Sequence, residues 1–352
     1  MSSSVDKTSS SQSLLSGQNV VYGGIAWAVL ALLFFLWFSI PVPGETRPFW
    51  YQITTYIFEQ GAFLGAALLC LRNWRSPQIA SGRNVWLGIG LGMMSFFIGN
   101  LFFGWWELYW GLDPAVSPAD LFFVAFYLFL GWGMVLAVLP RRLNLETWQW
   151  GVVVASASAA IALSVWLSLS APADLEEANA PSSTPTSQSV ASTASSKPPV
   201  TAQKAPAIKQ APKAVSPTAE KPSANSPSEA SSSQNQPPEW VLSLEKILEP
   251  LSRPLGLFYI VCDVFLLIIA ATLLLAFWGG RFAQSWRMIA AAALSFYIAD
   301  MWFKYATDHI PDYQSGFLLE VFWIFSGVLF AIGAGLEYEN SSRTRRGGRK
   351  RA

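Results

Sequence analysis

The chain of 352 residues has the composition of a protein that lies mostly in lipid. Hydrophobic residues make up 52% of it and charged residues only 13%, whereas a globular domain carries about 25% charged residues. The net charge of +1 gives no basic field that would attract nucleic acid. Two cysteines and one histidine exclude a disulfide framework, a zinc cluster and most histidine-based catalysis. We therefore expect no enzyme, no metal site and no cofactor.

The long apolar segments predict an all-α polytopic membrane protein, because their apolar residues run all round each helix. A helix needs about 20 apolar residues to cross the hydrocarbon core. After a polar cytoplasmic tail at 1–20, we expect about eight transmembrane helices. They are 21–40, 49–71, 85–108, 118–139, 150–170, 255–278, 285–305 and 316–337. The first half is 21–170, including the linking span 150–170, and the second half is 255–337.

The segment 171–238 between the two halves differs in composition. It holds 12 of the 22 prolines, five lysines and no aromatic residue, so it cannot bury enough apolar surface to fold. We expect a long disordered external linker, acting as a tether or, alternatively, as a spacer or glycosylated stalk. At 239–254 the helical spacing of Leu244, Ile247, Leu248 and Leu251 then predicts an amphipathic helix on the membrane surface.

The basic residues predict the orientation. With a cytoplasmic N-terminus, the inner loops hold seven arginines, whereas the outer side offers Arg47 and, at a span end, Lys304. The tail at 338–352 is also basic. Its charges predict docking on anionic lipid or on a cytoplasmic partner: Arg343, Arg345, Arg346, Arg349, Lys350 and Arg351.

An offset of 200 residues aligns the two halves. Ser95–Asn100 matches Ser295–Asp300, Asp120 matches Glu320, and Gly133 matches Gly333. We therefore expect two parallel four-helix repeats related by an axis along the membrane normal. Gly88, Gly90 and Gly92 give a face of small residues at which helices can approach closely.

Ionisable residues inside a span are costly and need a partner or a wet cavity. These residues fall in the predicted outer half, and the inner half is almost purely apolar. We expect them to form a ligand or signal-sensing cavity open to the outer face. The candidates, with two amides, are Glu59, Gln60, Asn100, Asp120, Asp263, Asp300, Lys304 and Glu320.

Several candidates also have a local structural explanation. Asp120 follows Ser117 and Pro118 as in an N-terminal capping box. Asp300 and Lys304 are spaced as an i, i+4 ion pair, and Asn100 can bond a neighbouring helix. The aromatic run Trp105–Trp110 fits an interfacial belt or a surface on which a ligand stacks.

The stretch Val116–Tyr127 resembles the multi-spanning sensory region that precedes bacterial GGDEF and EAL cyclic-di-GMP enzymes. Asp300–Phe303 and Glu320–Trp323 are similar to two further motifs of those regions. The resemblance implies a sensor of an outer-side or intramembrane signal. It departs from the pattern because only the basic tail follows residue 337.

We therefore expect a non-enzymatic membrane sensor or scaffold that contacts the lipid bilayer and passes a signal to a partner protein, either a signalling enzyme or a membrane complex. The expected location is a bacterial inner membrane or, alternatively, a thylakoid-type internal membrane. A small-solute or ion transporter and an assembly factor for a membrane complex remain open alternatives.

Overall fold

The computed structural model describes residues 16–40, 47–112, 116–139, 146–170, 237–277, 283–310 and 313–349. Within these ranges the regular structure is entirely helical, which confirms the all-α class. The long helices are α1 (Gly17–Phe38), α2 (Phe49–Arg75), α3 (Arg83–Gly104), α4 (Asp120–Val138), α5 (Thr147–Ser170), α8 (Ser252–Ala276), α9 (Ala283–His309) and α10 (Val321–Arg349). The predicted linker, apart from its last two residues, lies outside the described residues.

Seven helices of the described part are long and apolar enough to cross a membrane, so this is a polytopic membrane protein. They match seven of the eight predicted spans. The eighth predicted span is α9, which is as long as the others but less apolar. Its position explains this, because α9 packs against α5, α8 and α10. A helix enclosed by protein meets less lipid and tolerates more polar side chains.

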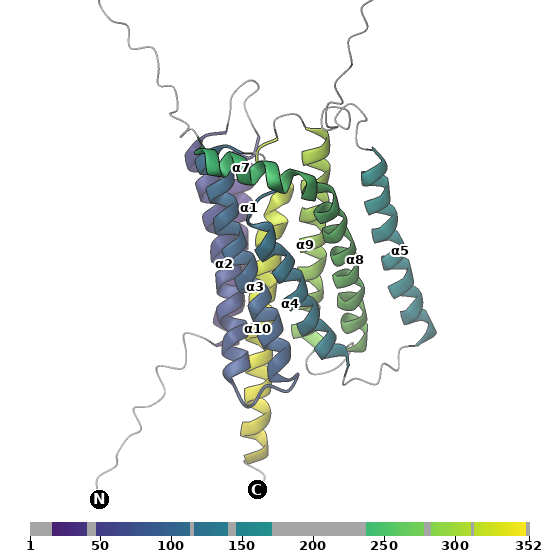
Figure 1. Ribbon diagram of the computed structural model, residues 1–352. Coiled ribbons are helices and arrows are strands. Elements are labelled where there is room, and N and C mark those ends of the chain that lie inside the picture. The colour runs from purple at the N-terminus through teal and green to yellow at the C-terminus, as the bar shows by residue number, and fades with distance from the viewer. Residues whose placement is uncertain are drawn as a thin grey trace, which may run out of the picture. The chain divides into compact units, whose positions relative to one another are not determined.

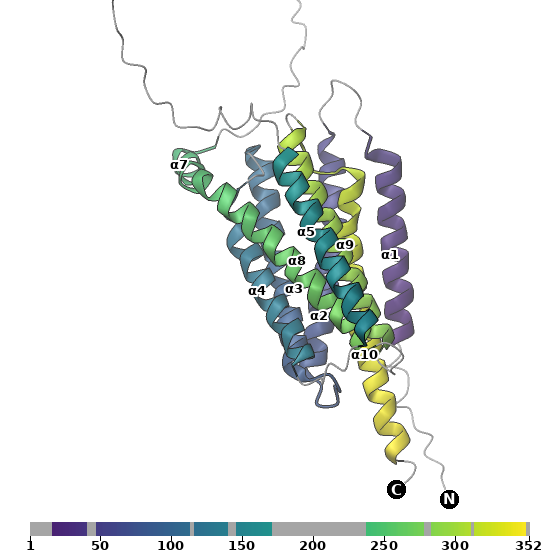
Figure 2. The same ribbon diagram turned by 90° about the vertical axis from the view of Figure 1, so that its right-hand side faces the viewer.

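The helices form two sets of consecutive neighbours (Figures 1 and 2). In one set α3 packs between α2 and α4, and in the other α9 packs between α8 and α10. The sets meet where α10 packs on α2 and where α4 packs on α8. Helix α1 covers α2 and α10, and α5 lies against α8 and α9. The main core therefore lies among six helices, with α1 and α5 at its edges.

Three aromatic pairs in this core join residues whose numbers differ by 200. The ring centroids of Trp86 and Trp286 lie 6.3 Å apart, and those of Phe96 and Phe296 lie 5.4 Å apart. Phe103 and Phe303 form a similar pair at 6.3 Å. Corresponding positions of the two aligned segments thus face each other along α3 and α9.

Two glycines mark equivalent close approaches between helices. A Cβ atom at Gly133 would lie 2.7 Å from the nitrogen of Ile89, and one at Gly333 would lie 2.7 Å from Cδ1 of Ile289. At Gly88 the added atom would lie 2.6 Å from the Cα of Gly133. As the small-residue pattern predicted, α3 and α4 approach almost to backbone contact.

The start of α1 and the end of α10 lie at the same end of the bundle, because Gly17 contacts Glu339. The distribution of basic residues predicts that this end faces the cytoplasm. We call the opposite end, where α2, α4, α8 and α10 begin, the outer end. The last turns of α10 extend past the neighbouring helices at the inner end (Figure 2).

The expected amphipathic segment forms α7 (Glu239–Leu248), followed by a 3₁₀ turn at Glu249–Leu251. It lies across the outer end of the bundle (Figure 1). Val241 is its buried anchor, whereas Ile247 remains 68% exposed. The Trp240 ring stacks on Trp105 at 6.2 Å, which ties α7 to the end of α3.

Candidate functional site

The loop before α10 is held by Glu320, which is buried in a 3₁₀ turn (Leu318–Glu320). One carboxyl oxygen accepts a bond from the Gly316 nitrogen at 2.6 Å. The other accepts from the Phe317 nitrogen at 3.0 Å and from the Tyr313 hydroxyl. Burial and the neighbouring Glu320 carboxyl raise the pKa of Tyr313. This arrangement makes Glu320 the anchor of the loop.

The opposite side of the loop is bound by α2 and the residues before it. Tyr51 donates to the Gly316 carbonyl at 2.6 Å, and Arg47 donates to the same oxygen at 2.5 Å. The Arg47 guanidinium also lies 4.2 Å from the centre of the Phe317 ring. Gly316 has a φ of +112°, and a Cβ there would lie 2.7 Å from the Tyr51 ring. Only glycine fits this turn.

Glu107 contacts the same loop from the end of α3. It lies in a single π-helical turn, Trp105–Tyr109, a form that often occurs at functional sites. Its carboxyl group accepts from the Tyr56 hydroxyl at 2.8 Å and from the Ser315 nitrogen at 3.2 Å. The aromatic run is thus more than a surface belt, because Trp106 is fully buried and Glu107 binds α2 and the loop.

Asp120 makes one of the two contacts of the predicted capping box and also contacts the second half; the residue before α4, Ala119, provides no side-chain cap. One carboxyl oxygen accepts from the Ser117 nitrogen at 2.7 Å. The other accepts from the Tyr259 hydroxyl of α8 at 2.5 Å. The residues 200 positions later form the equivalent contact, in which the Glu320 carboxyl group accepts a bond from the Phe317 nitrogen. One carboxyl oxygen of Asp120 therefore makes a local contact before α4, whereas the other joins the two halves.

Two acids of the second half, Asp263 and Asp300, meet at Tyr127 of α4. Its hydroxyl lies 2.6 Å from a carboxyl oxygen of Asp263 and 2.6 Å from one of Asp300. The second oxygen of Asp300 accepts from the Trp323 indole at 2.6 Å. The Tyr127 ring stacks on Tyr259 at 5.6 Å, next to Asp120. Four helices, α4, α8, α9 and α10, supply this cluster.

Glu59, Gln60 and Asn100 lie where α2 faces α3. Glu59 lies beside Asn100 and within electrostatic range of Asp300, Glu107 and Glu320. Gln60, with its amide oriented to satisfy both contacts, donates to the carbonyl of Phe97 and accepts from the nitrogen of Leu101. It thus bonds the backbone of α3 shortly before the π-helical turn.

Asn100 was expected to bond a neighbouring helix. Asn100 lies close enough to Glu59 of α2 for a side-chain hydrogen bond, although its buried nitrogen has no well-placed acceptor among the described residues. The expected interhelical bond of Asn100 therefore stays a prediction. The position of this side chain beside Glu59 keeps it within the candidate site.

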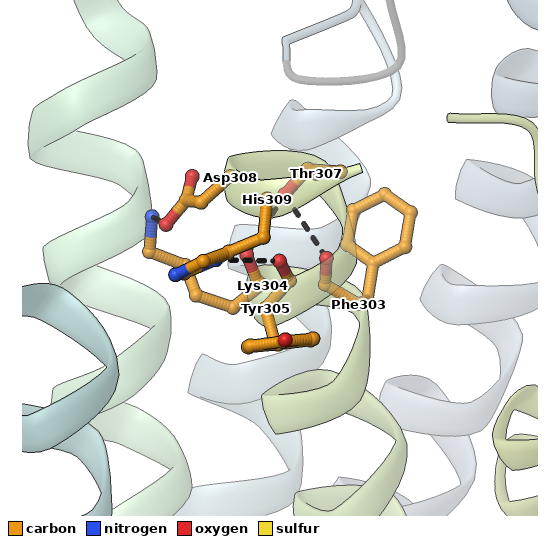
Figure 3. Close-up of polar contacts among 6 residues, drawn as sticks. All are labelled: Phe303, Lys304, Tyr305, Thr307, Asp308 and His309. Atoms are coloured by element: carbon orange, nitrogen blue, oxygen red, sulfur yellow. Dashed lines mark hydrogen bonds and ion pairs between the residues drawn. The ribbon is translucent and has the colours of Figure 1, made fainter. Parts of the chain in front are cut away.

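The expected ion pair between Asp300 and Lys304 is wrong. Lys304 instead bonds Asp308, one turn further along α9, at 2.6 Å (Figure 3). The same turn is closed by Thr307 on the Phe303 carbonyl and by His309 on the Tyr305 carbonyl. Asp300 faces the bundle interior, where Tyr127 and Trp323 are its partners, so Lys304 lies outside the cluster.

The inner end holds a polar contact that contradicts the expectation of an almost purely apolar inner half. Glu337 of α10 is fully buried, and it accepts a bond from the Ser81 hydroxyl at 2.7 Å. Ser81 accepts in turn from the Trp86 indole, and Asn73 donates to the Ala334 carbonyl. These bonds fix the loop between α2 and α3 to α10.

The basic tail can be located only in part. Helix α10 runs to Arg349, so Arg343, Arg345, Arg346 and Arg349 continue the helix at the inner end. Their side chains, with Lys350 and Arg351, lie outside the described residues. The docking role of these six residues stays a prediction.

Sequence reasoning missed the partners of the acids. Tyr127, Trp323, Tyr313 and Glu107 had no assigned role as partners of the acids. Within the described residues, no group of three or more His, Cys, Asp or Glu side chains could hold a metal ion. Comparisons with protein families, with curated proteins and with solved structures find no match.

Proposed function

We propose that the protein is a non-enzymatic membrane sensor or scaffold that relays an outer-side or intramembrane signal to a partner protein. This proposal rests mainly on one observation: hydrogen bonds between tyrosine hydroxyls and acidic side chains connect the two halves. Asp120 of the first half bonds Tyr259 of the second, and Tyr127 of the first bonds Asp263 and Asp300 of the second. A change at any of these groups therefore alters how the halves pack.

Helix α10 offers a route from this network to the cytoplasm. It begins beside the Glu320 anchor, contributes Trp323 to the acid cluster, and bonds the α2–α3 loop through Glu337. With 29 residues it is about 44 Å long at 1.5 Å per residue. A rigid helix that contacts both polar sites can carry a displacement between them. The two parallel repeats that the sequence predicts and the resemblance to bacterial sensory regions favour the same proposal, with a bacterial inner membrane as the proposed location.

The test uses photo-crosslinking in living cells, with a crosslinking residue at Arg345. We expect one partner to be captured, and we expect its yield to change at least two-fold when Asp300→Asn is added. Asp308→Asn is the matched control, because it removes an acid of the same helix outside the network. Failure to capture any partner, with wild-type behaviour after removal of 341–352, would contradict the proposal.

A proton-coupled transporter of a small solute is the second candidate. It is favoured by one observation, the burial of two carboxyl groups around a single hydroxyl well inside the bundle. Carboxyl groups of this kind serve as proton relays in transporters. Proteoliposomes that accumulate a solute only under a proton gradient, and lose this activity with Asp263→Asn, would favour transport over relay.

A further inference from the structure

The contact of Tyr127 with two carboxyl groups requires an additional hydrogen. A tyrosine hydroxyl has one hydrogen and can donate to one acceptor. Its oxygen nevertheless lies 2.6 Å from Asp263 and 2.6 Å from Asp300. If both carboxyl groups were ionised, one of these contacts would hold two oxygens 2.6 Å apart with no hydrogen between them. One of the two acids must therefore donate to the tyrosine oxygen.

The surroundings identify which acid this is. Asp300 accepts from the Trp323 indole at one oxygen and from the Tyr127 side at the other, so both of its oxygens have partners. Asp263 is only 2% exposed, and its second oxygen receives no hydrogen bond from a donor among the described residues. Besides Tyr127, the group within hydrogen-bonding range of its carboxyl group is the Asp300 carboxyl. An ionised carboxyl group without a partner is costly in such a place, whereas a protonated one is tolerated better.

Among the described residues, no positively charged group is a main electrostatic neighbour of either acid. In the described part of the chain, the titratable groups on which the pair acts electrostatically are acidic or neutral: Glu59, Tyr127, Tyr259, Cys262 and Tyr297. Asp120, Glu107 and Glu320 follow at the outer end. Lys304, one turn along α9, bonds Asp308. Two like charges would therefore face each other in a buried site.

We propose that Asp263, Tyr127 and Asp300 form a binding site for a single proton. Asp263 carries the proton and donates to the Tyr127 oxygen. The Tyr127 hydroxyl donates to the ionised Asp300, whose other oxygen accepts from Trp323. In this arrangement each donor in the row of hydrogen bonds has one acceptor. Release of the proton leaves two carboxylates on one hydroxyl, which weakens the contact of α8 with α4 and α9.

This inference deepens the proposed function. Its biological consequence rests on that function, because the bound proton would be the signal or a condition for the signal. Its test does not depend on a partner. The full-length protein in lipid nanodiscs is examined by infrared spectroscopy at neutral pH. Aspartate labelled with carbon-13 at the side-chain carboxyl separates aspartic from glutamic acid bands.

We expect a protonated aspartic acid band that is lost in Asp263→Asn and kept in Asp300→Asn and in the control Asp308→Asn. Tyr127→Phe should keep the band but shift its frequency, because the hydrogen bond is lost. Absence of the band in the labelled wild-type protein would overturn the proposal even if no variant folds. A band that vanishes when sodium replaces choline would also overturn it, because a metal cation would then occupy the site. The crosslinking of a partner at Arg345 tests the proposed relay of a signal, so the two proposals can fail independently.

Discussion

Removal of the Glu320 carboxyl group should destabilise the outer end more than removal of any exposed acid. Glu320→Ala leaves the Gly316 and Phe317 nitrogens and the Tyr313 hydroxyl without their acceptor. An unsatisfied buried donor costs about 1–3 kcal/mol. Because water at the membrane surface can reach part of the loop, we expect a loss of about 2–4 kcal/mol. Glu320→Gln keeps one acceptor oxygen and should lose about half as much.

The measurement is equilibrium unfolding in mixed micelles with increasing SDS. In a Cys262→Ser background, which removes the partly buried second cysteine, reaction of a maleimide dye with the buried Cys70 reports the unfolded fraction. Asp308→Asn is the matched control, because its carboxyl group bonds only partly exposed Lys304, and such pairs contribute about 0.2–1 kcal/mol. If Glu320→Ala cost no more than the control, the loop would not depend on this anchor.

Three further outcomes follow from single contacts. Gly133→Ala should lower stability by about 1–3 kcal/mol through overpacking, whereas Gly65→Ala, with nothing within 4 Å, should cost little; SDS unfolding compares them. Because the pKa of Tyr313 is raised in the folded protein, its hydroxyl contributes fully to stability below pH 10.0, and this contribution is lost as the pH rises above that value. Tyr313→Phe should therefore show a smaller loss of stability at alkaline pH. Trp240→Ala removes a stack on Trp105 worth about 0.5–1.5 kcal/mol, so limited proteolysis should cut near α7 faster; an unchanged rate would refute this contact.

Much of the fold could be predicted because the membrane imposes one simple rule. A backbone in lipid must satisfy its own hydrogen bonds, so each long apolar segment becomes a helix. The rule works least well for α9, whose polar residues are accommodated by neighbouring helices. The equivalent positions of Gly133 and Gly333 could be found because the same spacing occurs twice in the chain.

The site could be predicted only in part. The cost of an acid inside a span identified Asp263, Asp300 and Glu320, but it does not identify the partner. Tyr127 lies on another helix, and tyrosines are common in spans, so only the packing of the helices selects it. The ion pair with Lys304 failed because spacing along one helix carries no information about partners across an interface. Asp300 faces Tyr127 and Trp323, whereas Lys304 bonds Asp308. The π-helical turn that positions Glu107 also has no sequence signature.

In this structure a tyrosine of the first half binds acids of the second half. The coupling energy between Tyr127 and Asp300 tests this connection most directly. A double-mutant cycle with Tyr127→Phe and Asp300→Asn measures it by SDS unfolding. Side-chain hydrogen bonds between membrane helices average about 0.6 kcal/mol and reach about 1.7 kcal/mol. For this buried contact at 2.6 Å we expect a coupling energy of about 1 kcal/mol or more. Effects that add within about 0.3 kcal/mol would show that the two residues do not interact and that the halves are not joined there.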